Sequence, residues 1–160
     1  MPIKEEQLKA IEMMAAYEEA LCSLYKVYTQ KLPTYRDFWL KLSSEEAEHA
    51  MWVRDFENKA KEGLAYFDKN RFNLQAIKIS LDYVNEQIES ARSKDILPIK
   101  ALSMSLDLES ALIDNQWFEA FATDSAALRN LMEDLREAVK KHRERVKRAW
   151  EKERASRKGE

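Results

Sequence analysis

Glu46 and His49 are the residues whose types and spacing most clearly indicate chemistry in this chain. They interrupt a stripe of apolar residues spaced alternately by three and four, which reads Trp39, Leu42, Glu46, His49, Val53, Phe56, Ala60. This spacing places the whole stripe on one face of a helix. A carboxylate and an imidazole that face a core cost several kcal/mol unless something pairs with them, and a metal ion is one such partner. Glu-x-x-His on an inward helix face is half of the motif of carboxylate metal sites in bundle cores.

The elements that must position these side chains are predicted to be long helices. The 160 residues include only two glycines and three prolines, far fewer than a sheet protein needs for its turns. Apolar periodicity predicts helices over residues 5–32, 35–62, 74–93 and 99–122, and from 125 into a charged tail. We expect Pro33 and Gly63 to end the first two helices, and Thr34 and the pair Thr123–Asp124 to cap the helices that follow them.

The predicted fold is all-α. Four long helices joined by short, long and short connections form an antiparallel four-helix bundle, and its crossover over residues 63–98 contains the extra helix. Residues 1–150 are expected to form a single domain, followed by a charged, frayed tail over residues 151–160.

Five polar residues on these helices are predicted to meet in mid-bundle. Glu18 precedes Pro33 by about as many residues as Glu46 and His49 follow it, so all three lie about 20–24 Å from that turn. Glu109 and His142 flank Asp124 in a similar way. The two hairpins also echo each other in sequence, because aligning His49 with His142 superposes apolar positions on either side. The predicted metal ligands are therefore Glu18, Glu46, His49, Glu109 and His142.

Carboxylate metal sites in such bundles use six ligands, one glutamate from each of two helices and a Glu-x-x-His pair from each of the other two. One of these six positions has no ligand here. Val139, and not a glutamate, stands three residues before His142. Glu137 lies five residues before His142, on a different face of a regular α-helix, and would reach the site only through a π-bulge. A slight rotation of the first helix would instead replace Glu18 with Glu19 as the inward residue.

At this point the chain resembles the rubrerythrin-like branch of the ferritin-like superfamily over roughly residues 8 to 150. The resemblance is carried by Glu18 with Tyr25, by the segment from Phe38 to Ala50, and by Leu106-Asp107-Leu108-Glu109. It implies a carboxylate-bridged di-iron centre that oxidises ferrous iron or reduces peroxide and is held by the five predicted ligands, with Glu137 as a sixth only in the π-bulge alternative. We expect no rubredoxin domain beside the bundle, so peroxide reduction would need a separate electron-donor protein. We also expect a homodimer.

Other features of the sequence bear on the identity of the metal, on the partners and location of the protein, and on the roles of Cys22 and three tyrosines. Carboxylate and imidazole ligands suit iron, manganese and zinc alike. The net charge of −2 and the absence of a long apolar run argue against nucleic-acid or membrane partners, and a cytoplasmic location is expected. Cys22 is the only cysteine and is most simply a small buried residue. Core packing explains Tyr17, Tyr25 and Tyr28 most simply, although a redox role near the site is an alternative.

A second class of function fits the same residues. Because Val139 replaces a carboxylate, the chain could be a degenerate bundle that binds one ion or none and serves as a structural or partner-binding module. The number of bound ions per chain separates this hypothesis from the enzymatic one.

Overall fold

The computed structural model describes residues 5–64, 66–67, 74–114, 121–122 and 125–158. Five α-helices account for most of this part: α1 (Glu5–Lys31), α2 (Arg36–Lys61), α3 (Leu74–Ser93), α4 (Pro98–Asp114) and α5 (Ala126–Lys158). Two-residue strands β1 (Tyr66–Phe67) and β2 (Phe121–Ala122) pair antiparallel, with Tyr66 opposite Ala122. The all-α class predicted from the sequence is therefore confirmed for the described residues.

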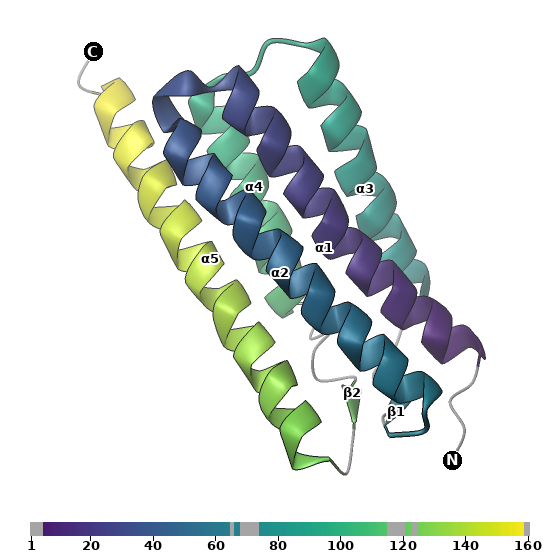
Figure 1. Cartoon of the computed structure of the whole chain (residues 1–160). Helices are drawn as coiled ribbons and strands as arrows, with labels where there is room; N and C mark the ends of the chain where they lie inside the picture. Colours follow the sequence, from purple (N-terminus) through teal and green to yellow (C-terminus); the bar gives the residue numbers. More distant parts are fainter. Residues whose placement is uncertain (1–4, 65, 68–73, 115–120, 123–124, 159–160) are drawn as a thin grey trace.

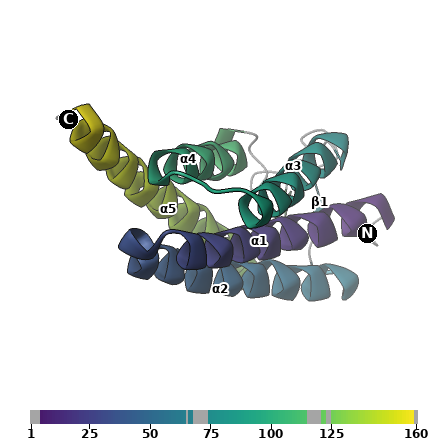
Figure 2. The same cartoon turned by 90° about the horizontal axis from the view of Figure 1, so that it is seen from above.

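The helices are arranged as an α1–α2 hairpin, an α4–α5 hairpin and a covering helix α3 (Figure 1). The closest helix pairs are α1 with α2, α1 with α3, and α4 with α5. Seen from above, α1 lies between α2 and α3, α4 lies on the same side of α1 as α3, and α5 runs obliquely from the α4 side toward α2 (Figure 2). The β1–β2 pair joins the connection after α2 to the connection before α5.

Most helix boundaries follow from local sequence signals. The first three predicted helices match α1, α2 and α3 within about one residue, and Gly63 closes α2 with a φ of 82°, which favours glycine. Pro98 stands at the first position of α4, where its missing N–H costs nothing. The side chain of Ser125 accepts a hydrogen bond from the backbone N–H of Leu128 at 3.3 Å, as a helix cap does.

Two expectations about helix ends are corrected. Thr34 does not cap α2, because Pro33–Tyr35 form a 3-10 turn and Tyr35 occupies the cap position without a side-chain hydrogen bond. The fourth helix does not run to residue 122, since Phe121 and Ala122 are extended and pair with β1. The predicted cap at Thr123–Asp124 lies outside the described residues. Residues 151–158 are helical as the last part of α5, and fraying of this tail stays a prediction.

The core lies between the two hairpins and under α3. Large side chains with less than 2% exposure fill it, among them Trp39, Tyr17, Tyr25, Tyr28, Phe56, Leu102 and Leu135. Burial of apolar area on this scale is the main term that stabilises the fold. In the middle of this apolar core, however, lies a group of buried carboxylates and imidazoles.

Candidate metal centre

The five predicted ligands come from four helices and are all buried. Glu18 lies on α1, Glu46 and His49 on α2, Glu109 on α4 and His142 on α5, with exposures between 0% and 3%. Their inward orientation follows from the three–four spacing that each shares with its apolar neighbours. Glu19 is about half exposed and pairs with Arg54, so the alternative in which it replaces Glu18 is wrong.

Glu46, His49 and His142 form the most compact part of this cluster. One ligand atom from each lies within 4.8 Å of the other two. Glu46 Oε1 is 2.8 Å from His142 Nδ1, and Glu46 Oε2 is 3.4 Å from His49 Nδ1. The two imidazole rings are tilted by 32° with centroids 4.6 Å apart. A carboxylate and two imidazoles at this separation could hold one metal ion.

Glu109 and Glu18 border this three-residue group. Glu109 Oε1 lies 3.6 Å from His142 Nδ1 and accepts a hydrogen bond from the Tyr25 hydroxyl at 2.7 Å. Glu18 is close enough to Glu46 that the charge of Glu46 helps raise its pKa. The structure therefore brings all five predicted residues to one place in the core. Their role as ligands stays a prediction.

Several polar atoms of the cluster have no hydrogen-bond partner among the described residues. These buried atoms are Glu18 Oε2, Glu46 Oε2, His49 Nδ1 and Glu109 Oε2. Buried polar groups in proteins are nearly always hydrogen-bonded, and leaving one unpaired costs about 1–3 kcal/mol, more when it is charged. His49 Nδ1 and Glu46 Oε2 lie 3.4 Å apart but are not hydrogen-bonded. A bound cation would give these two atoms and the neighbouring carboxylate oxygens of Glu18 and Glu109 a common partner. The residues present therefore fit a metal ion.

Electrostatics show why the cluster is costly without a cation. Burial, followed by the charge of Glu109, raises the pKa of Glu46 to about 7, and burial with the charge of Glu46 raises the pKa of Glu18. Burial lowers the pKa of His49. Burial also opposes the charged form of His142, but hydrogen bonds and charges from Glu109 and Glu46 raise its pKa to about 11. Protonated His142 thus serves as the counter-charge, and a metal ion binding at Nδ1 would displace that proton.

Glu45 and Arg145 were not predicted from the sequence, although both contact the site. His142 Nε2 lies 2.5 Å from Glu45 Oε2, and both terminal nitrogens of Arg145 bind the Glu45 carboxylate at 3.0 and 2.5 Å. Arg145 stands three residues after His142 and therefore on the same side of α5. That spacing, together with the Glu45–Glu46 pair, was the signal available in the sequence. By engaging Nε2, Glu45 turns Nδ1 of His142 toward the cluster.

The position of the absent sixth ligand is occupied by a packed side chain. Val139 is fully buried, and α5 is regular α-helix through this stretch. Glu137 is 55% exposed and pairs with Lys140 at 3.4 Å. The alternative in which a π-bulge delivers Glu137 to the site is therefore wrong for this structure.

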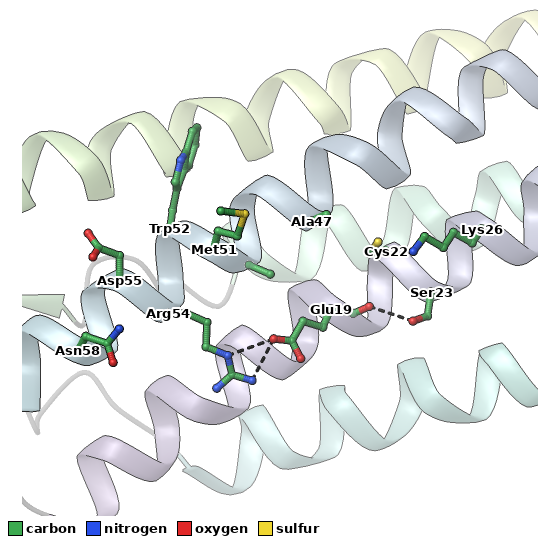
Figure 3. A pocket seen from close by; sticks show the side chains of 11 residues that line it. Glu19, Cys22, Ser23, Lys26, Ala47, Met51, Trp52, Arg54, Asp55 and Asn58 are labelled. Carbon is green, nitrogen blue, oxygen red and sulfur yellow. Dashed lines mark hydrogen bonds and ion pairs between the residues drawn. The ribbon is translucent and has the colours of Figure 1, made fainter.

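A hollow of about 770 Å³ lies on the outer face of the α1–α2 hairpin (Figure 3). Figure 3 shows the Glu19–Arg54 ion pair across it, with Met51, Asp55 and Asn58 along α2. None of the five predicted ligands lines this hollow. Trp52 connects the two regions, because it lines the hollow and its ring lies 5.4 Å from that of His49.

Cys22 lies at the base of the same hollow with 7% exposure. Its sulfur contacts the Ser43 hydroxyl at 3.4 Å. This placement agrees with the prediction of a small buried residue.

Comparisons with protein-family models, with curated proteins and with solved structures each return no match. Within the described residues, no helix combines the length and the apolar character needed to cross a bilayer.

Proposed function

We propose that this chain is a metal-binding helical protein of the ferritin-like, rubrerythrin-like kind, which oxidises ferrous iron or reduces peroxide. In this proposal α1, α2, α4 and α5 are the antiparallel four-helix bundle, and α3 is the extra helix of the crossover. The observation that carries it is the group of four buried donor atoms without hydrogen-bond partners at the junction of these helices.

The donor set favours iron. Two imidazoles and a carboxylate are the ligands that non-haem ferrous centres use, and neighbouring carboxylates are hard donors that can bridge a second ion. A single ion would be held by Glu46, His49 and His142 together. With two ions, Glu46 and His49 would hold the first and His142 the second, and Glu18 and Glu109 would supply further carboxylates. Iron held there would supply one-electron redox chemistry with oxygen or peroxide. Manganese and zinc are the alternatives for the same ligands.

The chain's own residues determine what such an ion would meet. Glu45 fixes the His142 ring, and the Tyr25 hydroxyl fixes one oxygen of Glu109. Peroxide reduction consumes electrons that no resident group of the described residues supplies. We therefore propose a separate electron-donor protein. The proposed function also retains the cytoplasmic location and the homodimer expected from the sequence.

A second candidate function is a one-metal bundle with a structural role. Val139 supports it, because it removes a terminal carboxylate from the second position, and the compact three-residue group suits a single ion. Both candidates predict metal binding and differ in the number of ions and in turnover.

The deciding experiment is elemental analysis of protein purified from an iron-replete host, followed by anaerobic ferrous titration calorimetry. About two iron ions per chain with oxygen-dependent ferrous oxidation would support the enzymatic proposal. One ion without turnover would support the structural role. Protein that binds no iron, manganese or zinc, and whose melting temperature is unchanged by chelator, would overturn both.

A further inference from the structure

Three oxidisable aromatic rings lie in mutual contact beside the candidate metal centre. Tyr25 and Tyr28 come from α1 and Trp39 from α2, and each is at most 1% exposed. Ring centroids are 5.5 Å apart for Tyr25–Trp39, 4.8 Å for Trp39–Tyr28 and 6.4 Å for Tyr25–Tyr28. Phenol and indole are the aromatic side chains that biological oxidants can oxidise by one electron, whereas the phenylalanine ring is not.

The inner end of this aromatic cluster contacts the metal centre directly. The Tyr25 hydroxyl donates to Glu109 Oε1 at 2.7 Å. A phenol that loses an electron must also release its proton, and this hydrogen bond gives the proton an acceptor. Loss of an electron from Tyr25 can therefore be accompanied by transfer of its proton along this hydrogen bond.

The outer end reaches a cavity on the opposite side of α1. Tyr28 lines a hollow of about 130 Å³ at the α3–α4 connection, together with Lys94, Lys100 and Met104. The hydroxyl of Tyr83, a 40% exposed residue of α3, contacts Met104 Sδ at 3.2 Å at this point. The rings thus extend from Glu109 to a cavity at the surface.

Packing alone does not account for Trp39. Its indole Nε1 is buried and has no hydrogen-bond partner among the described residues. Such an unpaired donor costs about 1–3 kcal/mol, which a phenylalanine at this position would avoid. A role that needs an oxidisable ring in the middle of the cluster would explain why tryptophan stands here despite this cost in stability.

We propose that Tyr25, Trp39 and Tyr28 form a relay that carries single electrons from the cavity at the α3–α4 connection to the metal centre. The inference rests on the proposed function and deepens it by locating where electrons enter. Hydrogen peroxide, the terminal oxidant, takes two electrons from the relay and two protons from solvent to form two waters. For each electron, Tyr25 is oxidised while its phenolic proton moves to Glu109; Trp39 or Tyr28 then reduces Tyr25 and the same proton returns, so the relay gains and loses no proton. The separate electron-donor protein of the proposed function supplies one electron at a time to Tyr28 at the cavity.

The first test needs no metal. A ruthenium–bipyridine photooxidant is attached to Lys94→Cys in a Cys22→Ser background, and radicals are followed by flash absorption. A long-lived tyrosyl signal is expected, and Tyr25→Phe should remove it. Trp39→Phe should slow its formation about tenfold, equivalent to a barrier about 1.4 kcal/mol higher. Tyr35→Phe is the matched control, because Phe38 separates Tyr35 from the cluster. An unchanged signal in Tyr25→Phe would overturn the relay.

The second test uses the iron-loaded chain. Ferrous protein is mixed with hydrogen peroxide and freeze-quenched, and organic radicals are identified by electron paramagnetic resonance. Tyr25→Phe should remove the tyrosyl component while iron stoichiometry stays that of wild type. Iron bound normally with no variant-dependent radical would overturn the relay and leave the proposed function standing. If light drives electron transfer between these rings but the protein binds no iron, the proposed function is overturned, and with it the delivery of electrons to a metal centre.

Discussion

The two hairpins contribute unequally to the cluster, although they echo each other in sequence. The α1–α2 hairpin supplies Glu18, Glu46 and His49, a glutamate plus a complete Glu-x-x-His pair. The α4–α5 hairpin supplies Glu109 and His142, with Val139 buried where the second pair needs its glutamate. His142 is instead held from across the interface, by Glu46 on one ring nitrogen and Glu45 on the other.

This difference shows how a symmetric fold can hold an asymmetric site. The first hairpin carries enough ligands for an ion, and the second adds one imidazole and one carboxylate. Losing an anionic ligand leaves more uncompensated positive charge on a metal ion at the second position. We therefore expect one tight and one weak metal position.

The largest effect is expected from Glu46→Ala, which removes the carboxylate that touches both imidazoles. Metal binding should be lost. In wild type, ferrous iron at about 100-fold its Kd should raise the melting temperature by about 5–10 °C, and the variant should show no such rise. Thermal melting with and without chelator measures this. Glu48→Ala, an exposed glutamate of the same helix, is the control and should retain the full shift.

Val139→Glu should make the second hairpin resemble the first. The added carboxylate should bring stoichiometry toward two ions and speed ferrous oxidation, while destabilising the metal-free protein because it buries another charge. The control Val139→Gln introduces a side chain of nearly the same shape as Val139→Glu but without the charge. It should leave both the metal stoichiometry and the rate of ferrous oxidation at their wild-type values. Anaerobic titration calorimetry decides the matter, and two equally tight sites in wild type would contradict the asymmetry.

Glu45→Gln should have a moderate effect on the His142 side. Removing the charge that fixes the His142 ring should weaken metal affinity about 10–100-fold, the usual loss when a partner of a ligand is removed. Competition with a fluorescent chelator would measure it. Glu144→Gln is the control: it changes an exposed glutamate of α5, the helix that carries His142, and should bind metal as wild type does. An unchanged affinity in Glu45→Gln would show that Glu46 alone orients His142.

The smallest effect is the pH dependence of the metal-free protein. The pKa of Glu46 is raised to about 7 and that of Glu18 is raised as well, so the folded chain holds protons that the unfolded chain releases. Stability should therefore fall as pH rises from about 4.5 through about 7. Above about 6.5, the raised pKa of His142 adds to this fall.

His49, whose pKa is lowered by burial, acts oppositely below about 6.5, so it offsets part of this fall. Glu45, Glu57 and Glu109, whose pKa values are lowered by neighbouring Arg145, by Lys61 with Arg54 and by His142, act oppositely only below about 4.5. Urea unfolding in chelator at about pH 5 and pH 7.5 tests the sign. Glu18→Gln should flatten the slope, and a wild type that is more stable at the higher pH would contradict the assignment.

Sequence periodicity predicted the helices and the inward residues because both depend on local spacing. Glu18 and Glu109 could be placed by their distance from a turn, even though the second turn lies outside the described residues. The β1–β2 pairing could not be predicted, since it joins segments far apart in the chain whose two-residue strands carry no periodic signal. Glu45 was also missed, because Arg145 and His142 reach it from another helix and only their spatial meeting reveals the contact.

The contact between Glu46 and His142 spans 96 positions of the chain. An ion coordinated by both residues would act as a removable cross-link that closes a loop of that length. A disulfide that closes a loop of about 100 residues lowers the conformational entropy of the unfolded chain, which stabilises the folded state by about 4–5 kcal/mol at room temperature. Metal loading should therefore slow the separation of the two hairpins, so that chelation would speed unfolding and expose their facing amides to hydrogen exchange together.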